Sequence, residues 1–149
     1  MNPFTGEVDK NEIMEVDGMT GFVADLQSAS KAMCSLKPTN DKERSALFKA
    51  ANNPDKRLSE MINMTINVRD VYVEEVTCKN QYGDSQVCPR IVFIDDKLVG
   101  YQCVSLGIFG ALKKLFQIYG VPTWKTPLKL MIKQINKGDK SLLTFDVVN

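Results

Sequence analysis

The chain has 149 residues, of which 44% are hydrophobic and 25% charged, and its formal net charge is +1. This length and composition are typical of one globular domain that buries a core without metal or disulfide staples. The chain has no histidine, which excludes histidine-based catalysis, Ser-His and Cys-His nucleophile pairs and most zinc sites. No apolar run approaches the roughly 18 residues that a membrane span needs. We therefore expect a protein without enzymatic activity, cofactor, metal or membrane contact.

Charge is distributed unevenly along the chain. Residues 1–60 carry eight lysines and arginines against ten acidic residues, a net charge of −2. Residues 85–140 carry nine against three, a net charge of +6. Such asymmetry is typical of a protein that binds a polyanion. The alternative is a lysine face that serves only for solvation.

The four cysteines, Cys34, Cys78, Cys88 and Cys103, form no C-x-x-C pair. The N-terminus lacks the basic and apolar stretches of a secretory signal. We therefore expect reduced thiols and a cytoplasmic location. Cys78 and Cys88 flank a turn, which leaves a bridge across a hairpin open.

The first part of the chain divides into an extension and a helix. Residues 1–38 are predicted to be a partly flexible extension, acidic over residues 1–20, with a short strand allowed just before Pro38. Residues 39–149 form the predicted domain. It begins with a helix that Asn40 caps, assisted by Glu43 three residues later, and that Pro54 ends.

Three strands are predicted next. From Met64 apolar residues alternate with polar ones, and their parity shifts at Arg69-Asp70, which indicates a β-bulge in a long strand running to about Lys79. The turn at residues 80–84 leads to a second strand over 87–94, and the Asp95-Asp96-Lys97 turn leads to a third over 99–104.

A helix and two more strands complete the pattern. Ser105 caps a helix with an apolar stripe, and Gly120 and Pro122 end it. Residues 126–138 fit a helix slightly better by period alone. The hairpin-like sequence at 136–140 and the alternation that follows it favour a strand, which is our prediction.

Strands and helix in this order match the OB-fold, a five-stranded barrel with a helix between strands 3 and 4. The segments 52–58, 66–76, 101–109 and 120–124 together resemble small single-stranded DNA-binding proteins of tailed bacteriophages, including phages with protein-primed replication. The resemblance covers roughly residues 40–148. It implies an OB-like barrel, preceded here by the N-terminal helix, that coats and protects single strands during phage DNA replication in the host cytoplasm. The chain ends without an acidic tail, so the acidic N-terminal segment is the one candidate for recruiting replication proteins.

Binding of single strands without sequence preference needs cations for the phosphates and flat side chains on which bases stack. The predicted nucleic-acid-binding residues are Tyr72, Lys79, Tyr82, Arg90, Lys97, Tyr101, Trp124, Lys125, Lys129, Lys133 and Lys137.

These candidates have competing interpretations. Tyr82 is predicted at a hairpin tip and Tyr72 on the side of its strand away from the core. Tyr101 has the parity of core residues, and Trp124 is either a stacking platform or a plug at the end of the barrel. Arg90 and Lys97 could clamp phosphates, and the lysines of the fourth strand would lie about 13 Å apart along one edge.

Two other functions stay open. OB barrels also bind proteins, which would suit the near-zero total charge, and the same face could bind RNA. The carboxylate pairs Glu74-Glu75 and Asp95-Asp96 have no third ligand or nucleophile near them in sequence, so we do not assign them a catalytic role.

Overall fold

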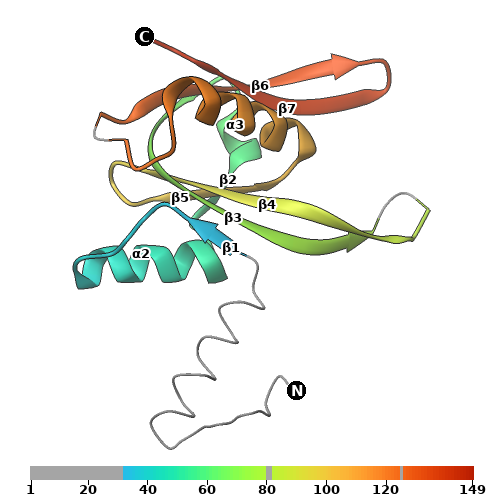
Figure 1. Ribbon diagram of the computed structural model, residues 1–149. Helices are drawn as coiled ribbons and strands as arrows, with labels where there is room; N and C mark the ends of the chain where they lie inside the picture. Colours follow the sequence, from blue (N-terminus) through green and yellow to red (C-terminus); the bar gives the residue numbers. More distant parts are fainter. Residues whose placement is uncertain (1–31, 80–81, 125) are drawn as a thin grey trace, which may run out of the picture. The chain divides into compact units, whose positions relative to one another are not determined.

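The computed structural model describes residues 32–79, 82–124 and 126–149 (Figure 1). The elements are β1 (Ala32–Cys34), α2 (Asp41–Asn52), β2 (Lys56–Arg57), the 3-10 helix η1 (Leu58–Met61), β3 (Thr65–Lys79), β4 (Ser85–Asp95), β5 (Gly100–Val104), α3 (Leu106–Tyr119), β6 (Leu128–Lys137) and β7 (Lys140–Val147). The described part is mainly β, with 47% strand and 26% helix, and its mixed sheet curls into a half-barrel. Residues 33–149 form one compact unit.

The predicted order of three strands, a helix and two strands is confirmed for β3 to β7. The strands lie in the sheet in the order β2-β5-β4-β3-β6-β7, and β1 pairs with β3. Neighbouring strands along this path are antiparallel, except for the short parallel pair of β2 and β5. The strand prediction for residues 126–138 is confirmed by β6, whereas β2 was not predicted.

The bend of β3 explains how one strand joins two parts of the sheet. The first part of β3, Thr65 to Val68, pairs with β6, and the part from Asp70 onward pairs with β4. The register against β4 shifts between Val68 and Asp70, so the bulge predicted at Arg69 is confirmed. A bulge sharpens the twist of its strand. The sheet therefore curls at this point.

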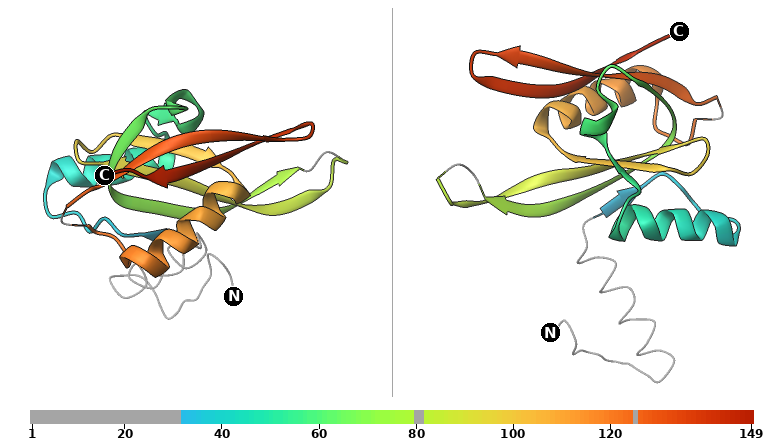
Figure 2. Two further views of the ribbon diagram at one scale, coloured as in Figure 1. Left: turned by 90° about the horizontal axis from the view of Figure 1, so that it is seen from above. Right: turned by 180° about the vertical axis from the view of Figure 1, so that it is seen from behind.

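Apolar residues pack on both faces of the sheet. Inside the curl, α3 contributes Ile108 and Leu112 to a cluster with Phe93 and Leu130. A second cluster lies between the sheet and α2. Its buried members are Leu36, Ala50, Tyr72, Val92 and Ile94. Figures 1 and 2 show α3 and α2 on opposite sides of β3, β4 and β5. No helix in the described ranges is long and apolar enough to span a bilayer.

Cys78 and Cys88 form a disulfide across the β3–β4 hairpin, which corrects the expectation of reduced thiols for this pair. Cys78 pairs with Gln86 and Cys88 with Val76, so the two cysteines are diagonal neighbours with Cα atoms 6.4 Å apart, a separation that a disulfide can span. Cys34 and Cys103 are free thiols. Burial raises the pKa of both, and raises that of Cys103 to about 12.

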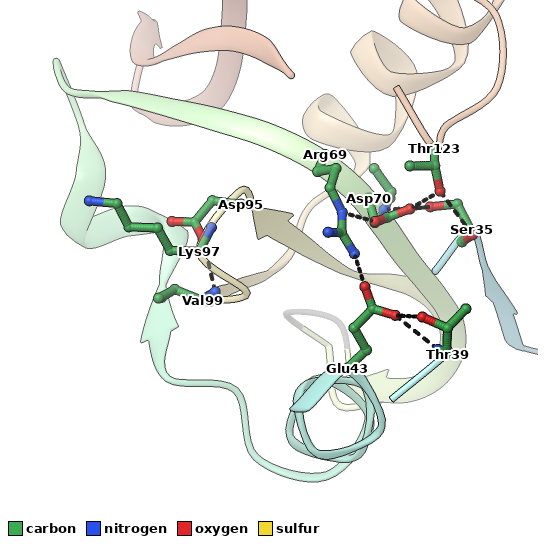
Figure 3. Close-up of polar contacts among 10 residues, drawn as sticks. Ser35, Thr39, Glu43, Arg69, Asp70, Asp95, Lys97, Val99 and Thr123 are labelled. Atoms are coloured by element: carbon green, nitrogen blue, oxygen red, sulfur yellow. Dashed lines mark hydrogen bonds and ion pairs between the residues drawn. The ribbon is translucent and has the colours of Figure 1, made fainter. Parts of the chain in front are cut away.

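The fully buried carboxylate of Asp70 connects three segments that are distant in sequence (Figure 3). It accepts hydrogen bonds from Ser35 Oγ at 2.8 Å, from Arg69 Nε at 2.8 Å and from Thr123 Oγ1 at 2.5 Å. The hydrogen bond to Asp70 also raises the pKa of the Arg69 guanidinium. Arg69 in turn donates to Glu43 of α2 at 3.3 Å. This network fixes β1, α2 and the α3–β6 connection to the bulge of β3.

We predict that Asp70→Ala lowers the free energy of unfolding by about 3–5 kcal/mol, because it leaves a partly buried guanidinium without its main partner. Urea denaturation followed by circular dichroism measures the change. The matched control is Asp41→Ala, which removes an exposed ion pair with Arg44 and should cost less than about 1 kcal/mol. Equal losses in the two variants would contradict the structural role of Asp70.

Candidate nucleic-acid interface

Two long hairpins extend beyond the packed body of the protein. The β3–β4 hairpin ends in the Lys79–Ser85 pair, and the β6–β7 hairpin ends in the Lys137–Lys140 pair. Gly138, with φ of 61°, allows the two-residue turn between Lys137 and Lys140. Figures 1 and 2 show that both hairpins project from the same side of the protein.

The tip of the β3–β4 hairpin presents an aromatic ring and a cation. Tyr82 is 79% exposed, the most exposed of the large hydrophobic side chains in the described residues, and Lys79 is exposed beside it. The Cys78–Cys88 disulfide joins the two strands just below the tip. The sequence-based expectation of an exposed Tyr82 at this tip is confirmed, whereas its role in binding stays a prediction.

The β6–β7 hairpin carries a row of lysines on its outer face. Burial along β6 alternates, with Leu130 and Ile132 inside, so the predicted placement of Lys129, Lys133 and Lys137 on the other face is confirmed. Lys140 lies opposite Lys137 in the register and was missing from the predicted set. Its position could be inferred only once the register of the hairpin was known.

These lysines differ in how their charge is compensated. Lys133 forms an ion pair with Asp146 of β7 at 2.5 Å, and both side chains are about half exposed. Within the described part of the chain, Lys129, Lys137 and Lys140 have no ion pair. The uncompensated positive charge of this hairpin therefore lies at its base and at its tip.

Tyr72 is buried, which corrects its assignment to a binding surface. Its ring does face away from the main core, as its parity predicted, but α2 and Leu36 cover that side of the sheet. The hydroxyl donates to Glu74 at 3.3 Å, and burial raises the pKa of the phenol. A base could reach this ring only after α2 had moved.

Tyr101 and Trp124 are also buried and do not offer a stacking surface. Tyr101 packs in the main core and donates its hydroxyl to Asp95 Oδ2 at 3.1 Å, so core packing, the favoured interpretation of its parity, is confirmed. Trp124 packs against Phe116 with ring centroids 6.1 Å apart and donates its indole N–H to the Tyr119 carbonyl at 3.3 Å. Of its two interpretations, the plug is the one observed.

Arg90 is a structural cation, which corrects its assignment as a phosphate clamp. Its guanidinium forms an ion pair with Glu74 at 2.7 Å and donates to Gln102 at 3.3 Å. A third hydrogen bond, 3.1 Å long, reaches the carbonyl of Ala50 near the end of α2. The arginine therefore joins α2 to the sheet, with all three of its nitrogens held by internal partners and its side chain only 12% exposed.

Lys97 is exposed in the turn between β4 and β5, and Figure 3 shows its side chain extending away from Asp95. This turn lies close to the start of β6, because Asp96 N–H donates to the Asn67 carbonyl and Asn67 pairs with Lys129. Lys97 and Lys129 thus belong to one end of the sheet. Lys125, also a predicted site residue, lies outside the described residues.

The structure therefore leaves part of the predicted set exposed, at the two hairpin tips and at the opposite end of the sheet, and it buries the other described members or engages them in internal contacts. The exposed members are Lys79, Tyr82, Lys97, Lys129, Lys137 and, half-exposed, Lys133, to which Lys140 is added. The described ranges hold no cluster of three or more acidic or cysteine side chains that could bind a metal ion. A depression of about 490 Å³ beside Arg69 and Trp124 is a poor anion site, since Arg69 is already neutralised by Asp70 and Glu43.

Comparisons with family models, with curated proteins and with solved structures found no match to this chain.

The phenol of Tyr101 gives a pH-dependent prediction. Burial and the neighbouring Asp95 raise its pKa to about 12, above the value of about 10 for a free tyrosine. Stability contributed by the neutral phenol is therefore complete below about pH 10 and is lost as the pH rises towards 12. Absorbance titration at high pH should show a late tyrosine step whose amplitude Tyr101→Phe reduces, leaving the smaller contribution of Tyr72, whose pKa is also raised by burial. Identical titrations for the wild type and Tyr101→Phe would contradict the assignment.

Proposed function

We propose that this protein binds single-stranded DNA without sequence preference, using its two projecting hairpins. The observation that carries the proposal is the exposed ring of Tyr82 on one hairpin and the row of lysines on the other, both on the same side of the protein. A ring on which bases stack and cations that follow the phosphates are the two requirements of such binding. The proposed role is to coat and protect single strands during phage DNA replication, and it includes no catalytic step.

The connectivity of the sheet supports an OB-type barrel. β3, β4 and β5 form an antiparallel meander, and after α3 the chain returns so that β6 pairs with β3 and β7 with β6. These pairings match those expected for strands 1 to 5 of an OB-fold, in which the connections between strands 1 and 2 and between strands 4 and 5 bind oligonucleotides. When β3 to β7 are counted as strands 1 to 5, these two connections are the tips of the β3–β4 and β6–β7 hairpins.

One feature of the sheet favours the hairpins over its strands as the binding surface. In OB-folds the face of strands 2 and 3 also binds ligands. Here the corresponding outer face of β4 carries Val92 and Ile94, both buried under α2, and Arg90, which is held by Glu74 and Ala50. We infer that the strand of DNA passes along the hairpins, where Tyr82 and the lysines are accessible.

The first experiment is a fluorescence titration with oligo-thymidine, duplex DNA and single-stranded RNA at two salt concentrations. We expect tight binding to oligo-thymidine that weakens as the salt concentration is raised, because lysines that bind the phosphates displace counterions from the DNA. An absence of binding at low salt would rule out the proposal. Tighter binding to RNA would favour the RNA-binding alternative, and tighter binding to the duplex would exclude a single-strand binder.

Tyr82→Ala is expected to weaken binding to oligo-thymidine by about 1–3 kcal/mol, the contribution of one stacked base. This corresponds to a loss of about 5- to 150-fold in affinity. Tyr119→Ala is the matched control, because Tyr119 is an exposed tyrosine at the end of α3, near residues 144–147 at the base of the β6–β7 hairpin and away from both hairpin tips. If both variants bind like the wild type, Tyr82 does not stack on the ligand.

Replacing both Lys137 and Lys140 with alanine should reduce the salt dependence of binding. Each lost phosphate contact lowers the slope of log K against log salt by about 0.7 for a single strand, so the double variant should lose about 1.4. The control replaces Lys42 of α2 and Lys113 of α3, both exposed. A slope that falls equally in both double variants would move the phosphate contacts away from the β6–β7 tip.

A further inference from the structure

The last strand of the sheet runs beside α3 with a groove between them. β7 has β6 as its neighbour on one side and no strand on the other within the described part of the chain. A depression of about 430 Å³ separates this open edge from the helix. Its lining includes Gly110, Ala111, Lys114 and Ile118 of α3 and Thr144 and Asp146 of β7.

The backbone of β7 offers hydrogen-bonding groups to this groove. Val148 N–H donates to the Lys129 carbonyl at 2.8 Å. Because the direction of these groups alternates along an antiparallel strand, Asp146 and Thr144 also turn theirs towards β6, and those of Phe145 and Val147 point to the open edge. An unpaired edge of this kind can accept an added strand from another chain.

The helix side of the groove exposes apolar side chains. Ile118 is 76% exposed, and Leu106 at the other end of the helix is exposed as well. A Cβ placed on Gly110 would meet no atom within 4 Å, so the middle of the groove is open. At the start of α3 the groove is closed, because a Cβ on Gly107 would lie 2.7 Å from the carbonyl oxygen of Leu143. From Gly110 to Ile118 the helix rises by about 12 Å, the length of about four residues in an extended strand. The groove thus fits one short extended segment with apolar side chains at alternate positions.

We propose that the N-terminal segment of a second copy of this chain occupies the groove, adding a strand to the open edge of β7. Residues 1–31 carry six acidic residues against two lysines, a net charge of −4, whereas residues 32–149 carry +5. Within the segment, Met14 and Val16 alternate with Glu15 and Asp17. The apolar pair suits the floor of the groove, and the acidic pair suits Lys114 of α3, which lines the groove and has no ion pair in the described residues.

Two geometric facts favour a second copy as the source of the strand. The described chain begins at β1, which lies on the α2 side of the sheet, opposite to α3 (Figures 1 and 2). The 31 residues that precede it could extend by up to about 100 Å, so the segment can reach a neighbouring molecule directly, whereas it would have to pass around an edge of the sheet to reach the groove of its own chain. If the edge strand of another folded sheet entered the groove, the strand next to it would collide with α3. A terminal segment is a single strand and has no such neighbour.

This contact joins two different surfaces, the segment of one copy and the groove of the next. Such a heterologous contact repeats from copy to copy and generates an open chain of molecules. The proposal does not depend on the proposed function, because the contact contains no nucleic acid.

Sedimentation velocity of the full chain without nucleic acid tests the proposal. The weight-average mass should rise above the 16.7 kDa of one chain as concentration is raised. Two kinds of variant should remain at the monomer mass. Gly110→Leu fills the groove, and the double variant Met14→Glu with Val16→Glu places charges where the segment needs apolar side chains. Ile118→Glu is a second groove variant at an exposed position. Phe48→Glu, which removes an exposed apolar side chain from α2, is the control and should associate like the wild type.

Mixing the variants gives the most specific result. The groove variant keeps an intact segment and the segment variant keeps an intact groove, so an equimolar mixture should form a heterodimer of twice the monomer mass and nothing larger. Heterodimer formation also shows that the segment variant, which supplies the groove, is folded, and the circular dichroism spectrum of the groove variant checks that it keeps the wild-type fold. A wild type that stays monomeric at every concentration, groove variants that associate like the wild type, or a mixture that stays monomeric would each overturn the proposal. Slowed amide exchange of Phe145 and Val147 in a monomeric wild type would mean that a chain fills its own groove, which also overturns it.

Discussion

The buried carboxylate of Asp70 is the contact on which the arrangement of the other elements depends. It receives hydrogen bonds from Ser35 before α2, from Arg69 at the bulge and from Thr123 before β6. A buried charge is tolerated only when its hydrogen-bonding capacity is met by partners of this kind. Because the bulge turns β3 from β6 towards β4, the same contact that holds the bulge also sets the direction in which the two hairpins project.

The position of α2 determines which surfaces can meet a ligand. Arg90 joins the sheet to α2 through Glu74 and the carbonyl of Ala50, and Tyr72 fills the space between them. The face of β4 that an OB-type barrel could use for ligands is thereby given to internal packing. The accessible aromatic ring and the uncompensated lysines lie instead on the hairpins, outside the area that α2 covers.

The local elements could be predicted from the sequence far better than the site. Period and parity gave the strands, the bulge at Arg69 and the face of Lys129, since these depend on neighbours in the chain. Parity assigns a side chain to a face but does not say which later element covers it. The face of the sheet that carries Tyr72 was therefore predicted correctly, whereas the prediction that its ring is accessible was wrong. The partners of Arg90 could not be predicted either, because they lie 16 and 40 positions away in the sequence. The period of the apolar residues in 126–138 also allowed a helix, and the segment is a strand because it pairs with β3 and β7.

The Cys78–Cys88 disulfide makes the two hairpins of the proposed interface differ in rigidity. The β3–β4 hairpin is cross-linked close to its tip, so the conformational freedom of its strands is already restricted before a ligand binds. The β6–β7 hairpin is held by the backbone hydrogen bonds between its strands and by the Lys133–Asp146 ion pair. Ordering a hairpin on association opposes binding through lost conformational entropy. The β3–β4 hairpin is therefore the more rigid of the two, and the β6–β7 hairpin is the one that adjusts to the ligand. Reduction of the disulfide acts on the β3–β4 hairpin alone.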